Sequence, residues 1–116
     1  LANNNYAYSL SERNLQLDRA QSMIETALKA EPKNPSYLDT MGWILYQRGN
    51  YKQAVQYILQ AIDNGEVSAT IYEHLGDAYH KIGEKEKAVQ AWREALRKEP
   101  NRHSAKERLS NGTATK

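Results

Sequence analysis

Three side chains that could bind a metal ion or transfer a proton lie at helical spacing in the second half of the sequence. Glu73, Asp77 and His80 follow one another at steps of four and three residues, which places them on one face of a helix. Two carboxylates and an imidazole are ligands that zinc accepts. The stretch offers no evident residues to orient them, however. We therefore favour a polar or pH-sensitive contact surface and predict no metal site.

Other catalytic chemistry finds little support in the residue types. The sequence contains no cysteine, which excludes disulfides, thiolate metal sites and a cysteine nucleophile. No glycine-rich phosphate loop occurs, and no local motif suggests a Ser-His-Asp set. We expect no catalytic residue, no cofactor and no enzymatic activity.

Aromatic residues are the stronger candidates for a binding role. Trp43 is followed one helical turn later by Tyr46, and Tyr8 aligns with Trp43 if the first part of the chain resembles the second. Aromatic side chains often anchor partner proteins. Trp43 could equally complete the hydrophobic core, since such rings bury a large area wherever they lie. Both interpretations of Trp43 stay open at this point.

Small residues recur through the chain at a period of 34 residues, which indicates an internal repeat. They are expected where two helix backbones approach closely, because a larger side chain would push the helices apart. The positions related in this way are Ala20, Ala54 and Ala88; Ala27, Ala61 and Ala95; Gly42 and Gly76; and Gly49 and Gly83.

Each repeat has the pattern of two helices. Apolar residues recur at steps of three and four, and Gly49 and Gly83 mark the ends of the first helices. Pro32 and Pro100 mark the ends of second helices. The first repeat needs one extra residue, which we place in a turn over 12–17. Stacked hairpins of this kind require about three copies to bury their apolar faces, and the sequence supplies three.

The third repeat carries the most specific resemblance to a known family. Tyr72, Leu75-Gly76, Tyr79, Gly83, Ala88, Trp92, Ala95 and Pro100 stand where the tetratricopeptide repeat consensus has its marked residues. The second repeat resembles it nearly as well, although it lacks the final proline, and the first does so only in its second helix. The resemblance covers about residues 3–100. A looser similarity connects the chain to the C-terminal repeat arrays of large bacterial proteins, including envelope lipoproteins.

This resemblance implies an all-α fold, a right-handed α-solenoid of three helical hairpins with a short C-terminal capping helix. The domain then covers residues 1–109, with repeats at about 1–33, 35–66 and 69–100, a capping helix at about 101–109 and a flexible tail at 110–116. It further implies a non-enzymatic module whose concave groove, lined by the first helix of each repeat, binds a protein or peptide.

The expected groove residues lie on the first helices, away from the apolar stripe of each helix. They are Asn4, Tyr8, Asp39, Thr40, Trp43, Tyr46, Glu73, His74, Asp77 and His80. The acidic members beside aromatic ones would suit a ligand with a Lys or Arg and an apolar neighbour, or they form an ordinary hydrated surface. Some family members grip a terminal carboxylate with Lys and Arg, but the corresponding positions here hold neither, and we predict no such clamp.

The overall charge gives little support to other partners. The net charge is +2, with the excess of Lys and Arg after residue 84, and no exposed aromatic residues are interleaved with it. We expect no nucleic-acid binding and no membrane insertion. The chain begins with Leu, which we interpret as an excised piece, so both the cytoplasm and a bacterial periplasm stay open. An alternative function is structural, as part of a longer solenoid or a self-associating segment.

Overall fold

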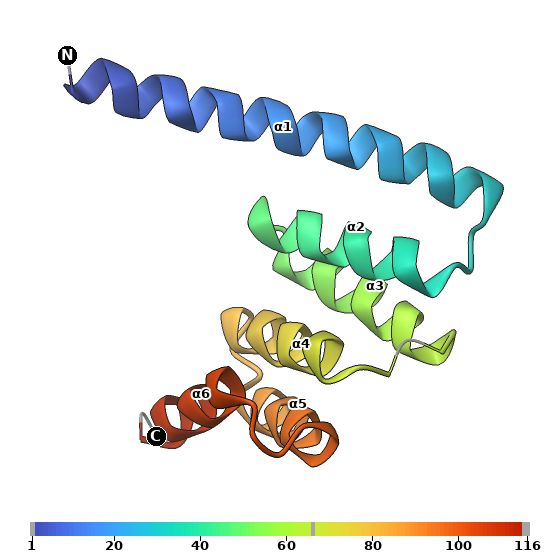
Figure 1. Cartoon of the computed structure of the whole chain (residues 1–116), viewed down its shortest axis with the longest axis vertical. Helices are drawn as coiled ribbons and strands as arrows, with labels where there is room; N and C mark the ends of the chain where they lie inside the picture. The colour runs from blue at the N-terminus through green and yellow to red at the C-terminus, as the bar shows by residue number, and fades with distance from the viewer. Residues whose placement is uncertain (1, 66, 115–116) are drawn as a thin grey trace.

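The computed structural model describes residues 2–65 and 67–114, and the side chains of 15–65 and 67–111. These residues form six helices and no strand (Figure 1). The all-α prediction is therefore confirmed. The helices are α1 (Ala2–Ala30), α2 (Pro35–Gln47), α3 (Tyr51–Asp63), α4 (Ala69–Lys81), α5 (Lys85–Lys98) and α6 (His103–Ala114).

Local sequence explains where the central helices begin and end. The Asn34 side chain accepts a hydrogen bond at the start of α2, and Ser68 does the same at the start of α4. Gly49 and Gly83 follow the ends of α2 and α4 with φ of 85° and 83°, a conformation that glycine adopts without strain. The two turns fold α2 back on α3 and α4 back on α5, as the sequence predicts.

Close helix contact depends on the repeated small residues. A Cβ atom built at Gly42 would lie 2.7 Å from Cγ1 of Ile58, and one built at Gly76 would collide with the ring of Trp92. Ala54 and Ala88, which face these glycines, are both fully buried. The expected approach of the two helix backbones in each hairpin is confirmed.

The main core lies between these two hairpins and includes the largest fully buried side chains, Leu38, Ile58 and Ile71. Side chains of Ile24 and Leu28 on α1 pack against its edge. Burying a Leu or Ile stabilises the fold by roughly 1.5–3 kcal/mol, so this core provides much of the driving force for stacking.

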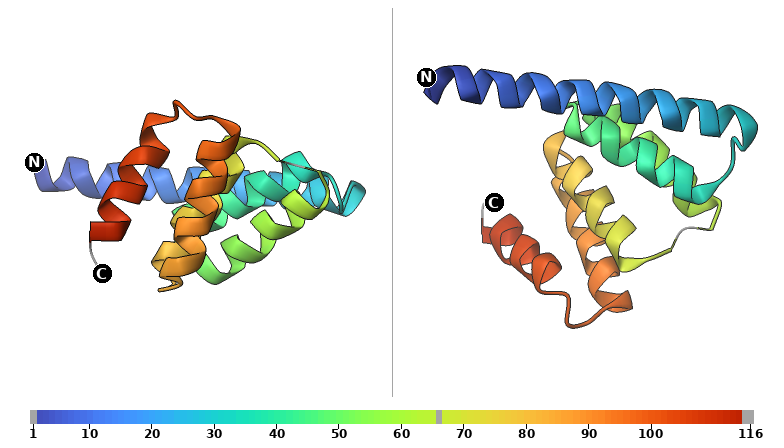
Figure 2. Two further views of the ribbon diagram at one scale, coloured as in Figure 1. Left: turned by 90° about the horizontal axis from the view of Figure 1, so that it is seen from below. Right: turned by 45° about the horizontal axis from the view of Figure 1, so that its top comes forward.

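The first repeat differs from its prediction. No turn occurs over 12–17, because α1 continues through this segment as one helix of 29 residues. The segment contains neither glycine nor proline, whereas glycine closes both observed hairpins. Nothing local therefore forces a reversal, and the N-terminal part of α1 projects past α2 (Figures 1 and 2).

The capping helix is longer than predicted. α6 starts at His103 and continues to Ala114, so residues 110–114, which the sequence analysis assigned to the tail, belong to the helix. Ala105 is fully buried and packs with Ala69 of α4 and Ala95 of α5. Figure 2 shows α6 alongside α5 at the end of the stack. In the described part of the chain, no helix is both long and apolar enough to cross a membrane.

Candidate functional site

Three aromatic side chains from two hairpins form a stacked row. The ring of Trp43 lies 5.0 Å from that of Tyr46 on the same helix and 4.1 Å from the ring of His74 on α4, both nearly parallel to it. Tyr46 also meets Tyr51 edge to face. We call Trp43, Tyr46 and His74 the aromatic row. It spans the junction between neighbouring first helices, where the sequence predicts the groove.

The aromatic row is half-buried. Trp43 is therefore neither fully buried in the core nor fully exposed, and its binding role stays a prediction. For Asn4 and Tyr8 the structure describes the backbone of α1 but not the side chains, so only their place on that helix is known. Thr40 is exposed, and its hydroxyl donates to the carbonyl of Ser36.

A pair of polar atoms beside the aromatic row has no hydrogen bond in the described part of the chain. Oδ1 of Asp39 and Nδ1 of His74 are both buried, and they lie 3.9 Å apart, too far for a hydrogen bond. Buried polar groups are normally paired, so two unsatisfied atoms in one place call for an explanation. Their separation is that of a His–Asp ion pair, and both atoms are closed to solvent, so a partner on the surface does not reach them.

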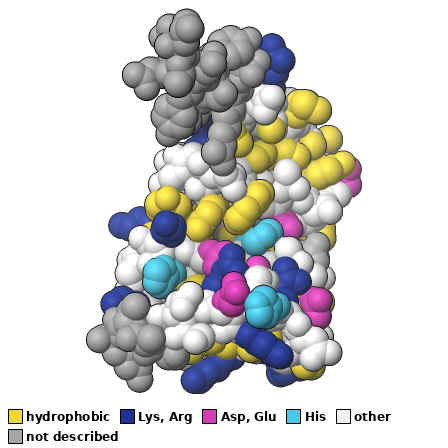
Figure 3. Space-filling view, turned by 60° about the vertical axis from the view of Figure 1, so that its left-hand side comes forward, with side chains coloured by type: hydrophobic (Ala, Val, Ile, Leu, Met, Phe, Trp, Pro, Cys, Tyr) yellow, Lys and Arg dark blue, Asp and Glu magenta, His cyan; other side chains and the backbone are white. Residues whose placement is uncertain are grey.

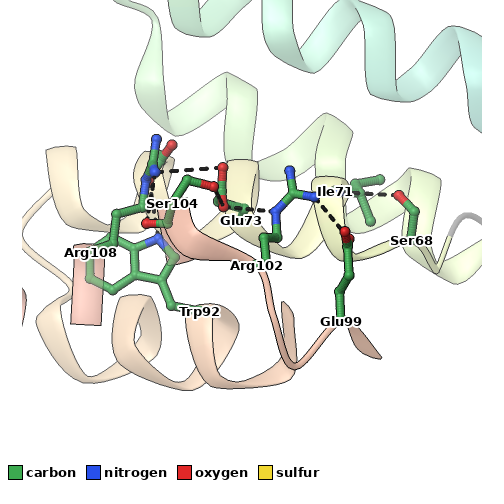
Figure 4. Close-up of polar contacts among 9 residues, drawn as sticks. Ser68, Ile71, Glu73, Trp92, Glu99, Arg102, Ser104 and Arg108 are labelled. Atoms are coloured by element: carbon green, nitrogen blue, oxygen red, sulfur yellow. Dashed lines mark hydrogen bonds and ion pairs between the residues drawn. The ribbon is translucent and has the colours of Figure 1, made fainter. Parts of the chain in front are cut away.

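The other two carboxylates differ from expectation, because they do not face an open groove. Glu73 is 6% exposed and Asp77 is 8% exposed. Glu73 accepts hydrogen bonds from Arg102 and from Ser104, at 2.9 and 2.6 Å. Figure 4 shows these side chains converging on Glu73, Arg102 from the loop before α6 and Ser104 from the first turn of α6.

Asp77 is satisfied in the same manner. Its Oδ1 accepts hydrogen bonds from Nε of Arg108 at 2.5 Å and from the indole nitrogen of Trp92 at 3.1 Å. Arg108 also lies 3.6 Å from a carboxylate oxygen of Glu73. The acidic-groove interpretation therefore fails for both α4 carboxylates, because the chain's own arginines already neutralise them.

Electrostatics favour the ionised form of Glu73. Burial raises the pKa of Glu73, but the hydrogen bonds from Ser104 and Arg102 and the charge of Arg108 outweigh it, so the pKa lies below its ordinary value. The pKa of Arg108 is raised, since its bond to Asp77 outweighs the effect of burial. The network holds α6 against α4 with full charges on both sides.

Sequence reasoning missed the role of Arg102 and Arg108. The available signal was the excess of Lys and Arg after residue 84, to which we assigned no role in the fold. His80, the third member of the predicted polar face, is exposed and lies 5.8 Å from the ring of Trp92. Among the described residues no cluster of three His, Asp or Glu side chains is placed to hold a metal ion.

An open pocket of about 320 Å³ lies beside the aromatic row, at the end toward α6. The face in Figure 3 shows a band of hydrophobic side chains bordered by histidine, acidic and basic ones. The pocket is lined by Tyr46, Asp77, His80, Lys81, Trp92, Arg108 and Asn111.

Comparison with known sequences identifies the same repeat family in a family model and in a relative. The family model described as Tetratricopeptide repeat matches residues 40–109. A TPR repeat-containing protein of Pseudomonas aeruginosa is 36% identical over 80 residues, which are 66% of this chain. The chain spans only 13% of the length of that relative.

Solved structures share the fold at low identity. A crystal structure of MamA superposes with a TM-score of 0.82 at 24% identity, covering 90% of this chain and 61% of that one. The first TPR of Spaghetti (RPAP3), bound to an HSP90 peptide, gives a TM-score of 0.83 at 18% identity, covering 92% of this chain and 85% of that one. At these identities the similarity shows the fold alone.

Proposed function

Because this chain belongs to the tetratricopeptide repeat family, we propose that it is a non-enzymatic module that binds a segment of a partner protein along α2 and α4. Domains of this family bind proteins or peptides, and the similar domain of Spaghetti was solved with a peptide bound. The proposal concerns this segment, since the relative from Pseudomonas is much longer than the chain.

The observation that supports this proposal most is the half-buried aromatic row on α2 and α4. Stacking alone does not require Trp43, Tyr46 and His74 to stay half-exposed. Rigid aromatic side chains in a partly desolvated site are typical binding hot spots.

The test is to select short peptides from a random display library on the immobilised chain. We expect selected peptides to bind the Trp43→Ala variant at least about tenfold more weakly, as for a hot-spot tryptophan. Leu59→Ala is the matched control, because Leu59 is an exposed apolar residue on α3. Circular dichroism would verify that both variants are folded. Equal affinities for wild type and Trp43→Ala would contradict the proposal.

A second candidate function is self-association through α1. In the described part of the chain, α1 packs mainly on α2, and it exposes Met23 (71%) and Leu15 (49%). An apolar surface of this kind could join a neighbouring repeat or another copy. Sedimentation at several concentrations distinguishes the two functions: a strict monomer favours peptide binding, and concentration-dependent dimers that Met23→Lys disrupts favour self-association.

A further inference from the structure

The pocket beside the aromatic row contains hydrogen-bond donors that nothing in the described part of the chain uses. Its only carboxylate, Asp77, already accepts bonds from Arg108 and Trp92. Lys81 and Asn111 make no hydrogen bond or ion pair among the described residues, and Lys81 lies only over the ring of Tyr51. Among these unpaired side chains, the ammonium of Lys81 and the amide nitrogen of Asn111 are hydrogen-bond donors.

The hydroxyl of Tyr46 adds a further donor to the wall of the pocket. Burial, followed by the charge of Asp77, raises the pKa of Tyr46, which keeps the hydroxyl protonated at neutral pH. The hydroxyl oxygen forms no hydrogen bond with described residues, and Tyr46 contacts Trp43 and Tyr51 through its ring.

The charges of the pocket lining also favour a negatively charged ligand group. Arg108 is paired with Asp77, so Lys81 provides the one positive charge of the pocket lining that no described carboxylate balances. The rings of Tyr46 and Trp92 form apolar walls, and a charge interaction is stronger beside such walls than in open water. The site therefore suits an acceptor with one negative charge.

We infer that this pocket binds the carboxylate of a Glu or Asp side chain from the partner segment whose apolar residues lie on the aromatic row. The inference rests on the proposed peptide binding and names the chemistry of one contact. It reverses the expectation from the sequence, in which three acidic residues would have selected a basic partner.

A side chain is the source we assign, rather than a chain terminus. The pocket is open and is lined by side chains from α2, α4, α5 and α6. A Glu or Asp side chain can enter it while the partner backbone stays at the mouth. A terminal carboxylate would require the partner chain to end at this point, which nothing in the pocket enforces.

The test uses NMR spectra of the full ¹⁵N-labelled chain titrated with N-acetyl-L-glutamate N-methylamide. We expect saturable shifts at the indole N–H of Trp92 and the side-chain amide of Asn111. The neutral glutamine analogue has nearly the same shape and should leave both signals in place. Lys81→Met should weaken binding of the glutamate probe about two- to fivefold, the range of a partly exposed ion pair.

Lys87→Met is the matched control for lost charge. Lys87 lies over the ring of Tyr79 at 5.7 Å, much as Lys81 lies over Tyr51 at 5.8 Å, but it does not line the pocket. Binding of the probe to this variant should be unchanged. The inference is overturned if the glutamine analogue shifts the same signals equally, if the two signals do not move, or if both lysine variants weaken binding alike.

A third probe separates the two sources of carboxylate. N-acetylglycine presents the carboxylate of a chain terminus, and tighter binding of this molecule than of the glutamate probe would overturn the side-chain assignment. Because these titrations use no peptide, their failure leaves the Trp43 experiment unaffected. Loss of peptide binding in Trp43→Ala without any response to the probes would retain the proposed function and remove only this pocket assignment.

Discussion

At the scale of single residues, the α4 carboxylates are paired with side chains that lie far away in the sequence. Glu73 bonds to Arg102, which lies 29 residues later, and Asp77 bonds to Arg108, which lies 31 residues later. Removing one member of a buried charged network leaves its partners unsatisfied, which costs more than the pair contributes.

We predict that Glu73→Gln lowers the free energy of unfolding by about 1–3 kcal/mol, because Arg102 and Arg108 lose a charged acceptor. Urea denaturation measures this change. Glu94→Gln is the matched control: Glu94 also pairs with an arginine, Arg97, but at the surface of α5, and no measurable change is expected. Equal losses in both variants would contradict the account of the buried network.

The lowered pKa of Glu73 makes the free energy of unfolding depend on pH. The pKa of Glu73 is lower in the folded chain than its ordinary value. Its contribution to stability is therefore present above the unfolded pKa of about 4.3 and is lost as the pH falls through the folded value. We expect the difference in unfolding free energy between wild type and Glu73→Gln to shrink between pH 6 and pH 3. A constant difference across this range would contradict the prediction.

Gly76 tests the close packing of the last hairpin. A Cβ atom at this position would collide with Trp92 and lie 3.0 Å from the carbonyl oxygen of Ala88. We predict that Gly76→Ala lowers the unfolding free energy by about 1–3 kcal/mol, the usual cost of overpacking. Gly42→Ala should cost less, because Cγ1 of Ile58 lies at 2.7 Å and the carbonyl oxygen of Ala54 at 3.3 Å, both farther than the corresponding atoms at Gly76. Thermal or urea unfolding of both variants measures the order.

At the scale of elements, the sequence was sufficient for the helices of the second and third repeats. Gly49 and Gly83 set the reversals, and the 34-residue spacing set which faces meet. It was insufficient for α1, since the apolar pattern of a helical hairpin also fits one straight helix when no glycine or proline breaks it. The orientation of α6 could not be predicted either, because sequence spacing does not specify which distant carboxylates an arginine reaches.

The continuity of α1 is directly measurable. The chain has no native cysteine, so Asn5→Cys and Lys29→Cys can carry spin labels without interference. Twenty-four residues of α-helix separate these positions by about 36 Å, at 1.5 Å per residue. A hairpin with its turn at 12–17 would bring them within about 15 Å, given helix separations of 8–10 Å. Electron–electron double resonance distances in the shorter range would contradict a continuous α1.

At the scale of the whole molecule, the stack presents one face with a specific composition. Paired helices bury the core residues, the arginines of the last segment neutralise the α4 carboxylates, and the aromatic row stays partly open. The location of this row on α2 and α4 could be predicted from the repeat, because equivalent positions of stacked first helices fall on one surface. Its stacking on His74 could not, since ring orientation depends on packing between hairpins.

The most direct test of this account is chemical-shift mapping of a display-selected peptide on the ¹⁵N-labelled chain. We predict that the largest changes cluster on α2 and α4, led by the indole N–H of Trp43 and the amide of His74. Further shifts are expected at the pocket residues Trp92 and Asn111, with little change along α3 and the rest of α5. Changes concentrated on α3 and α5, or confined to α1, would show that the partner binds elsewhere and would contradict the account.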